Sequence, residues 1–543
     1  MSFARLPTEV TRNIITAAIN VSSKDTNLPP YPLARLACVN AVFQQIVEEA
    51  NFEEIELESE EILPALVTLS RVKSRFGYVR RIFFVIRTPE YDEEPYKPIE
   101  DTEKVPQVMN NGYFTLATYF LFDFLSHWGM TTSHQKVDLH LLIKGPLPYH
   151  GIEGLQIPVH DQNCPLHELK AWTSSLNLAC SEHRPPAAFP FIKSFAHWHR
   201  NSLHLSPQSL GRIAFRFQKL ESLEWSFWDC QRYDLDLRRF NRQALATSLL
   251  QLPASVEKLG IHSMYLPPTD HDSPLPVITG PGLEDPATGA LRRASQNLRH
   301  LDASGVLGSP ELFWPERLSS ANKPAWPKME TLVITYHILN PHGEWLFEGD
   351  EEYESASEEY EDDEDDEEDE EDEEDESLLE EDHDGEGLSE DDDVEYPRMQ
   401  YNHLDWPMCM EYIHDDDLHP EDGKAKQFRY SANEKLMNDF YRAAGKALAC
   451  MPKLKLMKLD ALVFWNGRPL QFHAFKLSVV GRRAVATWTG SPAFRPSQEV
   501  LNVWMKSADK LDLTIRFEYA ERELIPPPSK ARFYAPQIEE LSR

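Results

Sequence analysis

Histidines and cysteines are the side chains of this sequence whose types and spacing could support chemistry. His197, His199 and His204 lie within "FAHWHRNSLHL". A His-x-His pair on a strand points both rings to one face, where they could bind zinc. No cysteine or carboxylate follows at ligand spacing, so ordinary packing is the reading that we favour, and we expect no metal site. A second group, in a polar loop at irregular spacing, comprises Cys409, His414 and His419.

The sequence lacks the motifs that organise common catalytic sites. It has no GxSxG nucleophile elbow, no GxxxxGK[ST] phosphate loop, no GxGxxG fingerprint and no HExxH pair. Carboxylate pairs for acid–base catalysis do not stand out among so many solvated ones. We therefore expect a protein that is not an enzyme and binds no cofactor.

Most of the net charge of −35 is confined to one segment. Residues 350–395 contain 32 Asp and Glu and no Lys or Arg, with sixteen consecutive carboxylates from Glu361 to Glu376. Outside this segment 57 acidic residues stand against 54 basic ones, so no basic surplus is available for phosphates and we expect no nucleic-acid binding.

A segment so poor in apolar residues cannot offset its ordering entropy, so we expect a disordered acidic insertion over 348–398. Three roles are open for it. It could be a solubilising loop, an attractor of basic partners such as histones, or a diffuse calcium-collecting tract.

The six cysteines are scattered and include no CxxC pair, which is typical of a reduced intracellular protein. The N-terminal residues do not resemble a signal peptide. No stretch approaches the roughly 20 apolar residues that span a bilayer. We expect a soluble protein of the cytoplasm or nucleus, without a membrane partner.

The stretch "RLPTEVTRNIITAAIN" predicts a helix that is apolar around more than half of its circumference. Pro7 suits the first turn, and Val10 and Ile14 share one broad arc while Ile15 lies well round from it. A surface helix usually carries an apolar stripe of roughly 100°. This helix therefore needs cover from two directions, supplied either by helices of the same chain or by a partner.

The segment "LARLACVNAVFQQIVEEANFEEIEL" continues with apolar residues at helical spacing, a break near Asn40 and a short strand at "FEEIEL". Three short helices and a strand make up a module over residues 1–58. A module of this size is small for independent stability, so we expect it to pack on the next part of the chain.

The two stretches "LPTEVTRNII" and "LARLACVNAVFQQI" resemble the F-box, the helical motif that docks substrate-recognition subunits onto the Skp adaptor of cullin-based ubiquitin ligases. The sequence departs from the motif in a longer loop between the helices and in Phe43, where Trp is common. The alternative is an F-box-like fragment with only a structural role. The resemblance implies that the protein binds a Skp-type adaptor and, through this adaptor, a cullin. The residues that it assigns to adaptor binding are Leu6, Pro7, Val10, Ile14, Ile15, Leu33, Leu36, Val39 and Phe43.

A weak repeat occurs further along the chain, with the pattern apolar-x-x-Leu-x-apolar. Each copy predicts a short strand with alternate apolar residues pointing inward, followed by a returning helix or loop. The copies are "LESLEW" (220–225), "VEKLGI" (256–261), "LRHLDA" (298–303), "METLVI" (329–334) and "LMKLDA" (456–461).

Two returning helices have recognisable starts. Ser206 and Pro207 suit the N-cap and first position of "SPQSLGRIAFRFQKL", and Ser431 with Glu434 suits a capping box in "SANEKLMNDFYRAAGKALAC". We further expect buried strands at "YVRRIFFVI" and "KVDLHLLI", a core helix at "YFTLATYFLFDFLSHW", a hairpin at "FHAFKLSVVGRRAVATWTG", a helix at "PSQEVLNVWMKSADK" and a strand at "LDLTIRF".

This arrangement resembles an irregular leucine-rich-repeat solenoid, so the predicted fold class is α/β, with an F-box ahead of the solenoid. We place the repeat region at 59–347 and 399–527, on either side of the acidic insertion, and an extended tail at 528–543.

The implied function is substrate recognition in an SCF-type (Skp–cullin–F-box) ubiquitin ligase, in which the protein raises the local concentration of an unknown protein substrate. Two alternatives are a non-catalytic acidic scaffold that binds basic proteins such as histones, with a vestigial F-box, and an unrecognised hydrolase. Trp225, Trp228, Trp314 and Trp345 are either contact residues for a partner or core residues.

Overall fold

The computed structural model describes residue 10 and residues 12–14, 38–72, 74–88, 104–129, 136–144, 175–178, 188–197, 204–229, 235–264, 275–280, 283–315, 323–349, 429–462, 473–490 and 494–521. Its helices are α3 (Ala41–Glu53), α4 (Ile62–Ser70), α5 (Ser74–Tyr78), α6 (Lys104–Gly129), α8 (Pro207–Ala214), α9 (Leu235–Leu250), α10 (Pro286–Ser295), α12 (Glu434–Leu448) and α13 (Gln498–Lys510).

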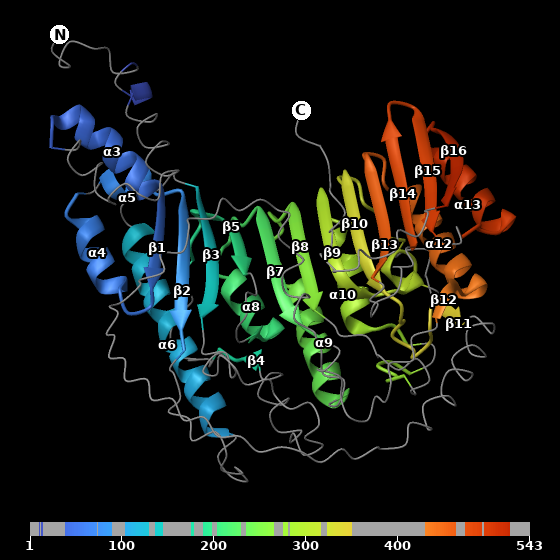
Figure 1. Ribbon diagram of the computed structural model, residues 1–543, viewed down its shortest axis with the longest axis horizontal. Helices are drawn as coiled ribbons and strands as arrows, with labels where there is room; N and C mark the ends of the chain where they lie inside the picture. Colours follow the sequence, from blue (N-terminus) through green and yellow to red (C-terminus); the bar gives the residue numbers. More distant parts are fainter. Residues whose placement is uncertain are drawn as a thin grey trace, which may run out of the picture.

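The main sheet has twelve strands, and their order in space is their order along the chain (Figure 1). Neighbouring strands are parallel, except that β14 is antiparallel to both β13 and β15. The strands are β1 (Glu54–Glu58), β2 (Arg81–Arg87), β3 (Val137–Lys144), β5 (Ile192–His197), β7 (Ser222–Trp228), β8 (Lys258–Met264), β9 (His300–Leu307), β10 (Thr331–His337), β13 (Leu456–Leu462), β14 (His473–Val480), β15 (Arg483–Gly490) and β16 (Thr514–Glu521).

One face of this sheet carries the core. Along β3 the side chains alternate between buried and partly exposed, as expected for a strand covered on one side. The buried residues of the strands form one cluster with helix residues such as Leu210 of α8, Phe440 of α12 and Trp504 of α13. Right-handed connections between successive parallel strands place the helices on one face, and the shared cluster agrees with this.

Four of the five predicted repeat copies are confirmed and lie side by side. Their central leucines, Leu223, Leu259, Leu301 and Leu332, are cross-strand partners on β7 to β10. The last apolar residues of these copies are also cross-strand partners, and they are Trp225, Ile261, Ala303 and Ile334. The repeat is therefore a real structural unit of one strand and its connection.

The fifth copy was predicted in the wrong register. Leu332 pairs with Met457 and Ile334 pairs with Leu459, so the equivalent residues are 454–459 and not 456–461. A shift of two residues keeps every side chain on the same face, which is why the apolar pattern fits both registers. In the observed register Leu456 pairs with Thr331, on the face opposite the helices.

Helix starts were predicted with mixed success. Ser206 caps α8 by accepting a hydrogen bond from Ser209 N at 3.2 Å, as expected. The predicted capping box at Ser431 and Glu434 is wrong, because Asn433 caps α12 by accepting from Leu436 N at 2.9 Å. Asn is as good an N-cap as Ser, and Ser431 is already part of a strand.

The other predicted elements that fall on described residues agree with the structure, whereas the helix predicted at residues 5–20 is described only at 10 and 12–14, and residues 33–37 lie outside the described residues. The two predicted buried strands are β2 and β3, and the aromatic helix lies within α6. The hairpin is β14–β15, with Gly481 at φ +59° in its turn, and α13 and β16 follow as predicted. The protein is thus a mixed α/β fold built on a large, mostly parallel sheet. No helix of the described residues is long and apolar enough to cross a membrane.

A small antiparallel ribbon joins the two ends of the acidic insertion. Strand β11 (Phe347–Gly349) pairs with β12 (Arg429–Ala432), with Phe347 opposite Ala432 and Gly349 opposite Arg429. Residues 350–428 are therefore inserted between two neighbouring points of the fold. Of the predicted segment 348–398, Glu348 and Gly349 belong to β11 and the rest lies outside the described residues, as does the predicted tail 528–543.

Buried charges tie together the carboxyl ends of the central strands. Asp229, just after β7, accepts hydrogen bonds from Arg238 at 3.1 and 3.2 Å and from Arg242 at 2.9 Å. Arg242 also donates to both carboxylate oxygens of Asp285, at 2.6 and 2.9 Å. Asp285 caps α10 by accepting from Thr288 N at 2.8 Å. The four charged side chains are all buried.

Burial alone would raise the pKa of the Asp285 carboxyl, but the Arg242 guanidinium and the Thr288 donors hold it below its usual value. Removing one member of such a network leaves a buried charge without its partner. We therefore expect Asp285→Ala to lower the free energy of unfolding by about 3–5 kcal/mol, measured by urea denaturation.

The matched control is Asp236→Ala in the first turn of α9. Asp236 also forms an ion pair with an arginine, Arg239 at 3.2 Å, but its side chain is 93% exposed. Exposed pairs contribute about 0–1 kcal/mol. Equal losses of stability for the two variants would contradict the structural role of the buried network.

Candidate partner-binding surfaces

The sheet face opposite the helices presents two rows of side chains to solvent across all twelve strands. We call these two rows the open face; Ala196 is the one buried position in them. The first row consists of Glu54, Arg81, Asp138, Ser194, Ser222, Lys258, His300, Thr331, Leu456, Ser478, Val485 and Arg516. The second row consists of Glu56, Phe83, His140, Ala196, Glu224, Gly260, Asp302, Val333, Lys458, Lys476, Thr487 and Glu518.

Charges on the first three strands of the open face are matched across the strands. Arg81 lies between Glu54 and Asp138 and forms an ion pair with Glu54. At the ends of the strands, Arg87 donates to both carboxylate oxygens of Glu58, at 2.5 and 2.9 Å, which lowers the pKa of Glu58. These pairs complement one another within the sheet and leave little net charge for a partner.

Two histidines, His140 in the open face and His262 beside it, are held by neighbouring side chains. His140 stacks on Phe83 with ring centroids 4.7 Å apart, and burial lowers its pKa to about 4. His262, which follows Gly260 on β8, lies with Nε2 3.0 Å from Oε1 of Glu224. His140 is therefore neutral at pH 7. Among the described residues, no group of three or more His, Cys, Asp or Glu side chains could hold a metal ion.

The β13–β14 part of the open face differs from the rest. Lys458 and Lys476 stand directly opposite each other on these two antiparallel strands. Like charges at such positions are destabilising, in contrast to the complementary pairs on β1 to β3. This is the one place on the open face where two Lys or Arg residues are cross-strand partners.

A second surface lies at the N-terminal end of the chain. Val10, Ile14, Val39 and Val42 are exposed by 41%, 45%, 55% and 41%, and we call these four the N-terminal surface. Arg12 reaches Glu49 of α3 at 3.2 Å, so the segment around residue 12 lies beside α3.

Among the residues that the F-box resemblance assigns to adaptor binding, the structure therefore leaves Val10, Ile14 and Val39 accessible. Phe43 differs, because it is only 6% exposed and lies on the buried side of α3 with Ile46 and Val47. Its side chain serves the chain's own packing and is not presented to a partner. The other assigned residues, Leu6, Pro7, Ile15, Leu33 and Leu36, lie outside the described residues.

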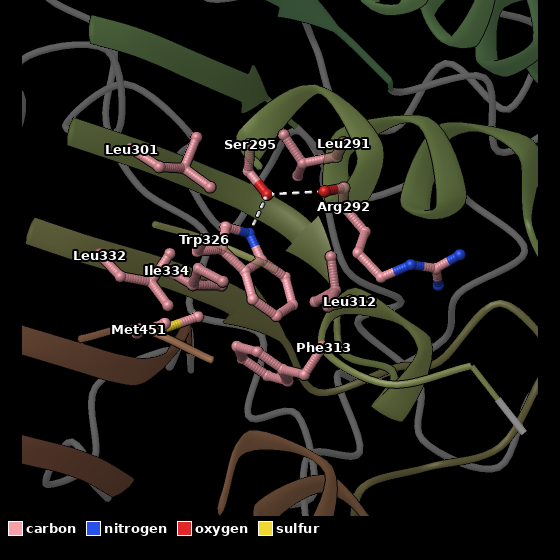
Figure 2. Close-up of a pocket in the computed structure, with 10 residues that line it drawn as sticks. All are labelled: Leu291, Arg292, Ser295, Leu301, Leu312, Phe313, Trp326, Leu332, Ile334 and Met451. Carbon is pink, nitrogen blue, oxygen red and sulfur yellow. Dashed lines mark hydrogen bonds between the residues drawn. The ribbon is translucent and has the colours of Figure 1, made fainter. Parts of the chain in front are cut away.

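A small interior cavity between α10 and the sheet is part of the core (Figure 2). Its volume of about 10 Å³ is room for about one water molecule. The Trp326 indole N–H donates to Ser295 Oγ at 2.8 Å, and Ser295 donates to the Arg292 carbonyl at 2.8 Å (Figure 2). With its polar groups satisfied and so little space, this cavity cannot hold a substrate.

The histidines and tryptophans singled out in the sequence take core positions where they are described. His197 is buried on β5, its Nδ1 is 3.1 Å from the Leu141 carbonyl, and burial lowers its pKa to about 4. Trp225 is fully buried, and Trp314 and Trp345 pack against the core. The side chains of His199, His204, Trp228, Cys409, His414 and His419 lie outside the described residues.

Comparison with known proteins bears on the C-terminal part of the chain. Residues 424–541 match a family of unknown function (DUF6546). The matched region includes α12, α13 and the strands β13 to β16, and so it contains Lys458 and Lys476. No curated protein and no solved structure matches the chain.

Asp460 lies two residues beyond Lys458, on the same face of β13 and opposite Thr335 and Ala474. Burial raises its pKa to about 6, so the folded state holds this proton more tightly than the unfolded state. Stability should therefore fall as the pH rises from about 4 to about 6, and stay level above that.

We expect Asp460→Asn to remove this fall in stability with rising pH. At pH 7.5 the variant should be more stable than the wild type by on the order of 2 kcal/mol, at 1.36 kcal/mol per pKa unit with a reduction for partial exposure. The difference should shrink as the pH falls toward 4.5 in urea denaturation. Asp236→Asn is the control. If the stability difference between Asp460→Asn and the wild type does not change with pH, then the burial of an ionised Asp460 is not its cause.

Proposed function

We propose that this protein is the substrate-recognition subunit of an SCF-type ubiquitin ligase. The N-terminal surface binds a Skp-type adaptor, and the open face of the sheet binds a protein substrate. The observation that carries the proposal is the exposure of Val10, Ile14 and Val39, three apolar residues within the segment that resembles an F-box.

The physical argument concerns apolar surface without cover. Single exposed apolar residues are normal, but here Val10 and Ile14 are exposed on one helical segment, and Val39 and Val42 are exposed in the turn before α3 and in its first turn; the Arg12–Glu49 ion pair joins the two segments. Burying such surface contributes about 25 cal/mol per Å². The first helix is apolar around more than half of its circumference. A partner that covers both segments would bury the apolar side of this helix that its own chain leaves exposed.

In this proposal the remainder of the chain contributes by holding the bound substrate in place. Strands in chain order, with helices on one face, support an irregular array that resembles a leucine-rich-repeat solenoid with longer repeats. Such an array holds a bound substrate at a fixed distance from the adaptor. Its contribution to ubiquitin transfer is a raised local concentration of substrate lysine, with no nucleophile, acid or base supplied by this chain.

The test is co-purification with a Skp-type adaptor, comparing the wild type with Ile14→Glu and with Val39→Glu. We expect the wild type to bind and each variant to bind at least about tenfold more weakly, because a buried carboxylate without a partner costs well over 1.4 kcal/mol. Both side chains are exposed, so the variants should keep the wild-type melting temperature.

Val480→Glu is the matched control, because Val480 is a 79% exposed valine at the end of β14. It should bind the adaptor as the wild type does. Absence of adaptor binding by the wild type, or equal binding by all four proteins, would refute the proposed function.

A second function, an acidic scaffold for basic proteins, is favoured by one observation. The 32 acidic residues belong to an insertion whose two ends meet at the β11–β12 ribbon, so Gly349 and Arg429 can be rejoined by a short linker. If this function holds, core histones should bind at low salt and be released on raising the salt toward 1 M, where screening acts within about 3 Å. Excision of 350–428 should abolish that binding in the same pull-down, whereas unchanged binding would exclude it.

A further inference from the structure

Lys458 and Lys476 form a basic pair on an otherwise balanced surface. As direct cross-strand partners, their Cβ atoms are about 4.5–5.5 Å apart, a spacing at which like charges oppose sheet formation. No ion pair of either lysine is found in the described part of the chain. The pair therefore keeps its charge available, at some expense of stability.

Neighbouring strands limit the basic pair on both sides. In the same row of the open face, Asp302 lies two strands beyond Lys458 and Glu518 lies two strands beyond Lys476. With strands about 4.8 Å apart, these carboxylates stand roughly 10 Å from the lysines, and Asp460 stands about 7 Å from Lys458 along β13 on the same face. The positive surface is narrow, so it suits a short anionic segment and repels a long one laid across the sheet.

Along the strands, toward the edge where β13 begins and β14 ends, the next row of the open face holds Leu456 and Ser478. At that edge, on the side of the helices, a hollow of about 420 Å³ is lined by Leu454, Val479, Lys453 and by Arg482, which forms an ion pair with Asp512 at 3.1 Å. Val479 N donates to the carbonyl of Lys455 at 2.8 Å, which joins the hollow to the strand that carries Lys458. An occupant running along the strand direction would meet both basic and apolar groups.

We propose that Lys458 and Lys476 bind a short Asp/Glu-rich peptide segment of a partner protein. The inference rests on the proposed function only in taking that partner to be the ligase substrate; the binding itself does not require the adaptor. Carboxylates would accept hydrogen bonds from the two ammonium groups, and an apolar side chain of the segment would lie against Leu456 in the neighbouring row.

The chemistry favours a peptide over a nucleic acid. Affinity for nucleic acid comes from many phosphate contacts along a basic track, whereas here acidic residues lie on both sides of a single pair. A second possible occupant is the acidic tract at 361–376 of this same chain, and the experiment separates it from a partner.

The test measures fluorescence polarisation of a labelled Asp/Glu-rich peptide, about eight residues long, with the full chain and with a chain in which a short linker replaces 350–428. An extended peptide of this length covers roughly 26 Å, the length of the strands that it would follow. We expect Lys458→Glu/Lys476→Glu to weaken binding more than about tenfold, because each attractive contact becomes repulsive.

Two further proteins distinguish lost binding from lost folding. Lys458→Gln/Lys476→Gln should also lose binding while melting at the same or a higher temperature than the wild type, because the repulsion between the lysines is removed. Lys144→Glu/Lys258→Glu makes the same change in net charge elsewhere on the sheet and should bind the peptide as the wild type does.

Each outcome bears on the inference. Binding that appears only after 350–428 is removed, and that needs both lysines, supports the site and identifies the chain's own tract as a competitor. Equal binding by all variants, or none by either chain length, overturns the inference. So does a single-stranded oligonucleotide of equal charge that binds more tightly through the same lysines. Failure of Skp binding leaves this measurement unaffected.

Discussion

One-sided burial of a sheet whose strands follow chain order is the constraint on which the rest of this structure depends. Because the helices that connect parallel strands lie on one face, apolar residues must alternate toward that face and polar residues toward the other. The clusters around Trp225 and Trp488 on one face, and the open face on the other, follow from this single requirement. Charges on the open face then have to be matched from strand to strand, as Arg81 is between Glu54 and Asp138.

The same topology explains the buried charges at the carboxyl ends of the central strands. Connections that turn back over one face bring polar groups into the interior, where each must find a partner. Arg242 bridges Asp229 and Asp285, so it links the end of β7 to the start of α10. A network of this kind costs desolvation of each charge, and its members offset that cost only while all of them stay paired.

Much of the fold could be predicted from the sequence because the apolar alternation of the repeats is regular. The register of Leu223, Leu259 and Leu301 follows directly from their motifs. Prediction failed where two patterns fit equally well, as with Met457 and Leu459 for the central position of the fifth copy, and where Asn433 and Ser431 could both cap a helix. Helical spacing also could not show that Phe43 faces the chain's own core while Val39 stays exposed.

The candidate peptide site was beyond sequence reasoning because it depends on strand register. Lys458 and Lys476 are ordinary surface lysines until the β13–β14 register sets them opposite each other. Their distance from the N-terminal surface is also fixed by the sheet, because α3 and β13 to β16 lie toward opposite ends of it (Figure 1). Eight strand spacings separate β1 from β13, or roughly 40 Å. A partner segment bound at β13 and β14 is therefore kept apart from whatever binds the N-terminal surface. The rest of that partner can lie in the space between the two surfaces.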